Sequence, residues 1–190
     1  MHLLSRLSLA AVLTLSLVAC GDDPVSYSQP VTINLKAKSD DTVNNVVEDD
    51  KNITTESGNP FAKFVTDARL ALGGADPSTI ELTATTLTLG AGSTGVLKLG
   101  EVFTGNTEVN LTMADTNNTY PAAWGVIEAT DGTTVTLETG FDTETLPDTD
   151  YAKVLAAGFK VGIRGPAAAG FAAKGADADI QVTLTFVAYE

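Results

Sequence analysis

Two runs, one near each end of the chain, alternate apolar and polar residues over eight or more positions. In VTINLKAK every second residue from Val31 to Ala37 is apolar, and in DIQVTLTFVAY the same stripe runs from Ile180 to Ala188. A period of two places all the apolar side chains on one face of a β-strand, whereas a helix would scatter them around its axis. The two runs therefore predict a first and a last strand, each with one buried face.

Shorter runs between these two extend the β pattern. Strands are predicted over the segments TIELTATTLTL, GVLKLGEV, TEVNLTMA, AAWGVIEA, TVTLE and FKVGIR. In TIELTATTLTL the apolar stripe that begins at Ile80 slips by one residue before Leu87, as it does at a β-bulge. Asp131 and Gly132, between AAWGVIEA and TVTLE, predict a hairpin turn.

Two segments carry helical signals instead. In NPFAKFVTDARLALGG, Asn59 is a suitable N-cap, Pro60 suits the first helical position, and two glycines follow the end. The apolar residues of this segment share one helical face, and they are Phe61, Phe64, Val65, Ala68 and Leu72. A shorter helix is predicted from about residue 147 to residue 157, with Gly158 at the C′ position.

Many short strands and one or two short helices predict a mainly β protein. The expected architecture is an antiparallel β-sandwich, either Ig-like or jelly-roll, with the helix from Pro60 covering an end or an edge. Residues 31–190 are enough to bury the core of a single domain of this kind.

The first twenty residues have the composition of a leader. Arg6 precedes an apolar run over residues 7–19, which is too short for a bilayer crossing of about 20 apolar residues. The run ends in the sequence LVAC, at Cys20, and this motif resembles the lipobox of bacterial lipoprotein precursors. The resemblance implies cleavage before Cys20, a diacylglycerol thioether on its sulfur, and acylation of the new amino terminus, which together make a stable anchor. The alternative is an incidental thiol beside an ordinary cleavage site, which would need a small residue where Leu17 stands.

The chain is thus expected to divide into a signal peptide over residues 1–19, a lipidated tether over 20–30 and one domain over 31–190. Gly21, rather than aspartate, follows the cysteine. By resemblance to the sorting of enteric lipoproteins, this favours the outer membrane, with the domain on its periplasmic or surface face. The expected partners are the membrane itself, through Cys20, and an envelope protein or a glycan.

The mature chain lacks side chains on which many enzymes depend. The only histidine, His2, lies in the leader, and Cys20 is the only cysteine, so no disulfide, Ser-His-Asp triad or His-ligated zinc site can form. Without the leader, ten basic residues face twenty-four acidic ones, a formal charge of −14 that repels nucleic acid. We therefore expect neither an enzyme nor a nucleic-acid-binding protein, although residue types alone leave a two-carboxylate glycoside hydrolase open.

Three acidic segments offer the oxygen ligands that calcium prefers, and calcium is the one cofactor that the composition suggests. They are SDDTVNNVVEDDKN, DTNN and DTETLPDTD, and none has the spacing of an EF-hand. Asp115 and Asn117, both in DTNN, are placed first as metal ligands. The simpler interpretation is that these acidic loops are solvated surface.

Tyr120 and the only tryptophan, Trp124, follow DTNN directly. An exposed aromatic ring can stack on a sugar while neighbouring polar groups bond its hydroxyls, but a lone tryptophan in a strand is more often core. Phe171, in the run GPAAAGFAAKG, is interpreted as a core plug rather than as a membrane or partner contact. Two functions stay open. One is a non-catalytic interaction or structural domain, and the other is a calcium- or carbohydrate-binding module that uses the loop from Asp115 to Trp124.

Overall fold

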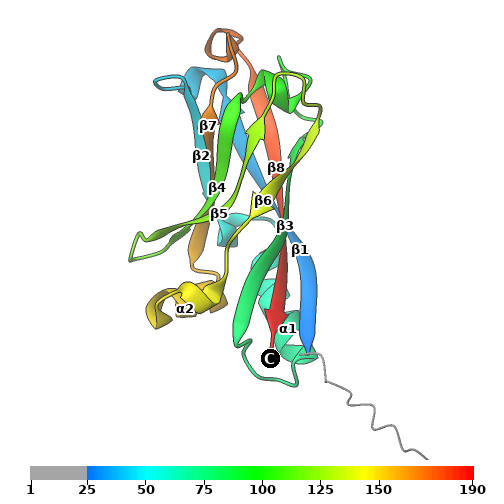
Figure 1. The fold of residues 1–190 in the computed structure, drawn as a ribbon, viewed down its shortest axis with the longest axis vertical. Coiled ribbons are helices and arrows are strands. Elements are labelled where there is room, and N and C mark those ends of the chain that lie inside the picture. Colours follow the sequence, from blue (N-terminus) through cyan, green and yellow to red (C-terminus); the bar gives the residue numbers. More distant parts are fainter. Residues whose placement is uncertain (1–24) are drawn as a thin grey trace, which may run out of the picture.

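Eight antiparallel strands carry the fold of residues 25–190, which are the residues that the computed structural model describes (Figure 1). The strands are β1 (Ser26–Lys38), β2 (Val46–Asn52), β3 (Thr79–Leu89), β4 (Gly105–Met113), β5 (Thr119–Ile127), β6 (Thr134–Thr139), β7 (Phe159–Pro166) and β8 (Asp177–Tyr189). One face has the order β1-β8-β3-β6 and the other β2-β7-β4-β5, and a short β5–β6 ladder joins them. This alternation of the chain between two four-stranded faces is a jelly roll, so the antiparallel sandwich is confirmed and the jelly-roll alternative holds over the Ig-like one.

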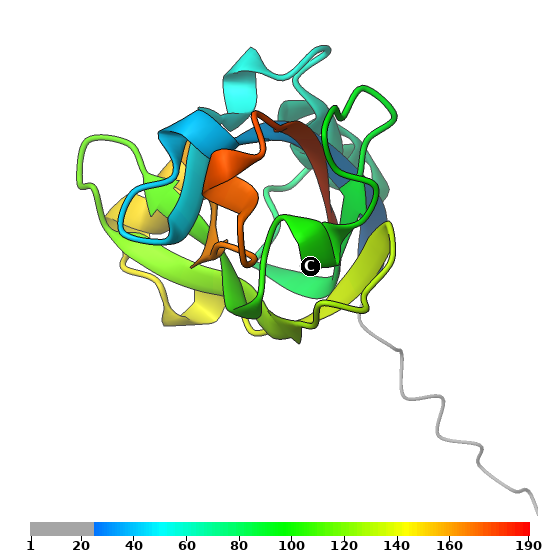
Figure 2. The same ribbon diagram turned by 90° about the horizontal axis from the view of Figure 1, so that it is seen from above.

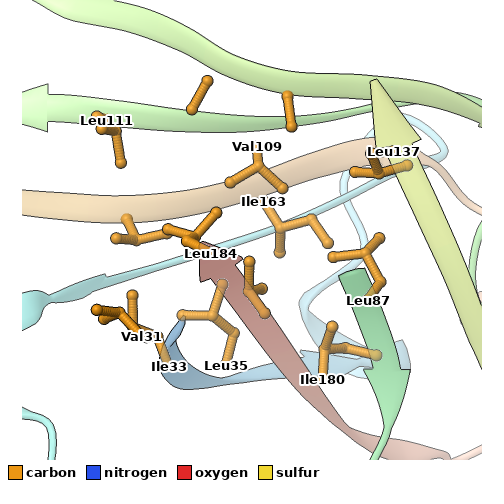
Figure 3. Close-up of a cluster of buried hydrophobic side chains, with 14 of the residues drawn as sticks. Val31, Ile33, Leu35, Leu87, Val109, Leu111, Leu137, Ile163, Ile180 and Leu184 are labelled. Carbon is orange, nitrogen blue, oxygen red and sulfur yellow. The ribbon is translucent and has the colours of Figure 1, made fainter. Parts of the chain in front are cut away.

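The core fills the space between the two faces (Figure 3). Leu184 on β8 and Ile163 on β7 come from opposite faces, and each is at most 1% exposed. The predicted stripes on β1 and β8 are buried throughout, because the two strands pair along their whole length from Ser26 with Tyr189 onward. Each buried Val, Leu or Ile contributes about 1.5–3 kcal/mol. Phe171 is also fully buried, as predicted for a core plug.

Helix α1 (Pro60–Ala71) confirms the strongest local prediction in the sequence. The Asn59 side chain accepts a hydrogen bond from the Ala62 N–H at 3.3 Å, which satisfies one of the free donors at the helix start. All five residues of the predicted apolar face are buried. Phe61 packs edge-on against Phe159 and Phe186, with ring centroids 4.9 and 5.0 Å apart, and so fixes the helix to the strands.

Helix α2 (Asp148–Leu155) ends two residues before the predicted end at residue 157. Ala157, rather than Gly158, adopts the left-handed conformation at φ 54°. The Gly158 N–H then bonds the Lys153 carbonyl at 2.7 Å and the Ala157 N–H bonds the Val154 carbonyl at 2.9 Å, which is a Schellman motif. The left-handed backbone costs alanine about 1 kcal/mol, which burial of the Ala157 methyl group helps to offset.

Three segments differ from prediction. Strand β2 lies within SDDTVNNVVEDDKN, which the sequence predicted as an acidic loop, and it forms because it pairs with β7. GVLKLGEV is not a strand but contains a 3₁₀ turn at Leu99–Glu101, because the Glu101 carboxylate accepts the Leu97 N–H at 2.9 Å and curls the backbone. Strand β1 begins at Ser26, so residues 26–30 belong to the domain and the predicted tether is shorter than 20–30. Pro30 is tolerated there because β1 is an edge strand that pairs only with β8.

Further short 3₁₀ turns lie in the connections, at Ser39–Asp41, Ile53–Thr55, Thr143–Thr145 and Phe171–Ala173. The register slip predicted in β3 is confirmed as an irregularity between Leu82 and Ala84. Strands β5 and β6 do pair antiparallel around the predicted Asp131-Gly132 turn, but only through two residue pairs, because β6 turns away to pair with β3.

The two ends of the sandwich differ. Strand β1 begins and β8 ends at the same end, where both helices also lie (Figure 1), and we call this the tether end. The connections 39–45, 90–104, 128–133 and 167–176 gather at the opposite, distal end, which Figure 2 views from above. Within residues 25–190, no helix is long and apolar enough to cross a membrane.

Candidate functional site

Asp115 and Asn117 lie in the tight turn between β4 and β5, both with left-handed backbone at φ 68° and 56°. The Asp115 carboxylate forms an ion pair with Lys153 on α2. A lysine ammonium at this position occupies the place where a bound cation would need further oxygens. Among residues 25–190 there is no group of three or more His, Cys, Asp or Glu side chains that could hold a metal ion. In this structure the Asp115 carboxylate is therefore engaged in a surface ion pair.

Asp150, in the first turn of α2, is the centre of a buried polar network beside that turn. Its carboxylate accepts hydrogen bonds from Tyr120 Oη at 2.6 Å, Asn118 Nδ2 at 2.7 Å and Thr116 Oγ1 at 3.0 Å. The bond from Tyr120, followed by that from Asn118, lowers the pKa of Asp150 against the opposing effect of burial. The same bond raises the pKa of Tyr120. Tyr120 thus holds α2 against the β4–β5 turn, and its hydroxyl is committed to Asp150.

A β-bulge separates Tyr120 from Trp124. Val109 pairs with Ala123 but Asn110 pairs with Pro121, so Ala122 is an extra residue in β5. Residues four apart in a regular strand share a face, and one inserted residue reverses that relation. Tyr120 consequently points to the inner side of the sheet and Trp124 to the outer side. The structure does not bring these two predicted ligand-binding residues together.

Trp124 is 37% exposed on the outer face of β5, so the alternative that it belongs to the core does not hold. Its indole Nε1–H donates a hydrogen bond to Glu138 on β6 at 3.2 Å. The six-membered ring lies against Gly140, where a Cβ atom would come within 2.4 Å of a ring carbon. The ring is therefore fixed in orientation while part of it faces solvent, which is the arrangement of a stacking surface.

A row of charged residues runs across the outer face through Trp124. The strand registers place Glu48, Arg164, Glu108, Trp124 and Glu138 side by side on β2, β7, β4, β5 and β6. Arg164 Nε–H donates to Glu48 Oε2 at 3.2 Å. We call this set the outer row. It combines carboxylates, a guanidinium group and an aromatic ring on one surface, and groups of these kinds can bind polar ligands.

A groove of about 240 Å³ lies beside the outer row. Its floor is Gly162, which the register places between Asp50 on β2 and Asn110 on β4. The other lining residues are Glu48, Asp49, Thr112, Thr119, Ile163 and Arg164. We call it the Gly162 groove. The sequence places Glu48, Asp49 and Asp50 in an acidic segment that offers calcium ligands. It does not single out the other lining residues, for which the one available signal is a glycine inside the alternating run FKVGIR.

Comparison with known proteins adds little to this description. No protein-family model matches the chain, and no curated protein matches it. Two solved structures share a distant likeness, one described as Desmodium yellow mottle tymovirus and one as the empty head of turnip yellow mosaic virus. The first is 11% identical with a TM-score of 0.34 over 98% of this chain and 95% of that one. The second is 12% identical with a TM-score of 0.28, over 98% and 90%. The strand order defines a jelly-roll domain. One of its sheet faces is polar and bears the exposed Trp124.

Proposed function

We propose that this chain is a lipoprotein of the cell envelope whose jelly-roll domain is a non-catalytic binding module. The LVAC motif at Cys20 supports the lipid anchor, and the cysteine itself lies outside the described residues. Signal peptide cleavage before Cys20 would remove residues 1–19, and Gly21 favours an outer membrane as the destination. The formal charge of −14 after cleavage opposes binding to nucleic acid or to anionic headgroups, so the lipid is the membrane contact.

The observation that carries this proposal is the start of β1 at Ser26. Only residues 21–25 then separate Cys20 from the domain, a stretch that spans about 20 Å at most. A lipidated Cys20 would therefore hold the tether end close to the bilayer and direct the distal end away from it. The outer row would stand at the side of the molecule, open to partners along the membrane surface.

An interaction with an envelope protein or a glycan fits the outer face better than a structural role alone. The indole of Trp124 is held in place by Gly140 and Glu138 and still exposes 37% of the residue. Because the ring is held in one orientation with part of it in solvent, a ligand can stack on it without first ordering the side chain. The calcium-binding alternative has no comparable support, because Asp115 pairs with Lys153.

Replacement of Cys20 by serine tests the anchor. In cells that process lipoproteins, we expect the wild-type chain in the membrane fraction, released by detergent and labelled by radioactive palmitate. Cys20→Ser should appear in the soluble fraction without label, because the thioether cannot form. Ser16→Ala, a small change in the same leader, serves as the control and should behave as the wild type. An unlabelled wild-type chain, or a Cys20→Ser chain that stays in the membrane, would contradict the proposal.

A further inference from the structure

Gly162 is not required by the backbone that it occupies. Its φ is not in the left-handed region, and a Cβ atom there would meet only Asp49 O and Asp50 Cβ, both at 3.6 Å, which is ordinary contact. Gly165 on the same strand differs, because a Cβ there would come within 2.6 Å of the Thr107 hydroxyl. A glycine inside a strand weakens the strand and often marks close approach of a ligand. What Gly162 provides is the hollow itself.

The walls of the Gly162 groove carry groups that bond hydroxyls. Asn110 supplies an amide, and Arg164 supplies a guanidinium group with more donors than its single bond to Glu48 uses. Asp50 supplies a carboxylate that also forms an ion pair with Lys160 Nζ at 3.1 Å and keeps further acceptor capacity. Thr112 Oγ1 and Thr119 Oγ1 lie 3.0 Å apart at the other side of the groove. Donors and acceptors are thus interleaved within one shallow space, as a ligand with many adjacent hydroxyl groups requires.

Trp124 lies two strands from Arg164 along the outer row. Strands are spaced by about 4.8 Å, so the two Cα atoms are about 10 Å apart. A ligand that fills the groove and also covers the indole must therefore be extended, with an apolar face for the ring and polar groups for the groove.

The residues and strands around the Gly162 groove favour one class of ligand over the others. Glu48, Asp50 and Glu108 disfavour a polyanion at this face. An extended peptide usually binds by adding to a free strand edge, but β7 and β4 are each paired on both sides. Strand β2 is an edge strand, and its Asp49 carboxylate accepts a hydrogen bond from the Lys36 N–H of β1 at 2.7 Å, so β1 lies beside that edge. A neutral chain of sugars needs no backbone edge, because its hydroxyl groups bond side chains.

We propose that the Gly162 groove and Trp124 form one binding site for a neutral saccharide chain. This inference rests on the proposed function, since it names the ligand of the binding module. Gly162 leaves room for one sugar unit among Asp50, Asn110 and Arg164, and the chain continues across Glu108 so that a second unit stacks on the indole. No bond is made or broken in the ligand.

Fluorescence titration tests this site directly, because Trp124 is the only tryptophan. Residues 21–190 contain every residue of the hydrophobic core, from Val31 to Ala188, and so suffice for the experiment. Cellohexaose, maltohexaose, xylohexaose and chitohexaose are the probes, each titrated to about 10 mM, which detects millimolar dissociation constants. We expect a saturable change in emission with at least one of them.

Variants then locate the site. Gly162→Val fills the hollow with a β-branched residue that suits a strand. It should weaken saccharide binding at least tenfold and leave the midpoint of thermal unfolding unchanged. Trp124→Ala should also weaken saccharide binding at least tenfold. Its binding is measured by calorimetric titration, because this variant has no tryptophan fluorescence. Gly132→Val adds the same side chain where no atom lies within 4 Å of the new Cβ, and it should bind like the wild type.

Failure of all four probes with a folded protein would overturn the saccharide site. Saccharide binding that is unchanged in Gly162→Val would also overturn it. The same holds if an envelope protein binds this face in place of the saccharide and Gly162→Val prevents that protein from binding. None of these results affects palmitate labelling of Cys20, so the lipid anchor and the saccharide site are tested independently.

Discussion

The Asp150 carboxylate is buried between α2 and the β4–β5 turn, where it accepts hydrogen bonds from three side chains. A buried charge is tolerated only when its acceptors are filled, and here Thr116, Asn118 and Tyr120 fill them. Because the lowered pKa belongs to the folded state, the charged form stabilises the fold above the unfolded pKa of about 3.9. That contribution is lost as the pH falls through the folded pKa.

Asp150→Asn should therefore destabilise the domain at neutral pH. The amide keeps the shape but turns one acceptor into a donor that faces other donors, so we expect the thermal midpoint to fall by on the order of 5 °C. Asp148→Asn removes a carboxylate from the same helical turn at an exposed position and is the matched control. Equal midpoints for the two variants at pH 7 would contradict this role of Asp150.

The position of the Trp124 ring depends on the absence of a side chain at residue 140. Gly140→Ala would place a methyl group within 2.4 Å of the ring, so the indole must move outward. We expect its fluorescence to shift to longer wavelength, because the ring becomes more hydrated, while the midpoint of unfolding changes little. Gly132→Ala, in open space, should leave the emission unchanged. An unshifted spectrum for Gly140→Ala would show that the ring does not rest on this residue.

At the scale of elements, β1 is an edge strand whose free side is closed by carboxylates. The Asn34 N–H donates to Glu56 Oε2 at 3.1 Å, and the Lys36 N–H donates to Asp49 Oδ2 at 2.7 Å. Glu56 also accepts from the Asn34 amide at 2.9 Å and from Lys51 Nζ at 2.8 Å. An open edge invites pairing with other chains, and these side chains occupy its donors.

Glu56 makes the stability of this edge dependent on pH. Burial alone would raise the pKa of Glu56, but hydrogen bonds from Lys51 and Asn34 outweigh burial and lower it to about 2. Since the unfolded pKa is about 4.3, the stabilisation is fully present above that value and is lost as the pH falls toward 2.

Glu56→Ala should lower the free energy of unfolding by about 1–3 kcal/mol at pH 7, because one backbone donor and two side-chain donors lose their partner. Urea unfolding at pH 7, 4 and 3 measures the effect, and the difference from the wild type should shrink as the pH falls. Glu128→Ala, at an exposed loop position, is the control. A constant difference across this pH range would rule out the carboxylate charge as its source.

Elements whose signals are local could be predicted, and those that depend on partners could not. The cap and the apolar face of α1 lie within one segment, and the slip in β3 was visible because apolar residues mark both registers. The bulge in β5 was hidden, because Ala122 and Ala123 are both small and either could face inward. That is why Tyr120 and Trp124 were grouped in the sequence and lie on opposite sides of the sheet.

At the scale of the whole molecule, alternation predicted seven of the eight strands, but it predicted neither β2 nor which strands lie side by side. Strand β1 pairs with β8, more than a hundred residues away, and no local pattern encodes that choice. The Gly162 groove likewise combines residues from β2, β4, β5 and β7, so only the assembled sheet shows it. The predicted tether reached residue 30, but β1 begins at Ser26. The edge position of β1 explains how Pro30 is accommodated in a strand.

The proposed lipid anchor is the central claim at this scale, since it would set which end of the jelly roll faces the membrane. Mass spectrometry of the amino-terminal peptide, from protein purified out of membranes, tests it most directly. We predict a chain that begins at Cys20 and carries diacylglycerol on the sulfur and an acyl group on the amine. A chain that retains residues 1–19, or that begins at Cys20 with an unmodified thiol, would contradict the anchor and the orientation that follows from it.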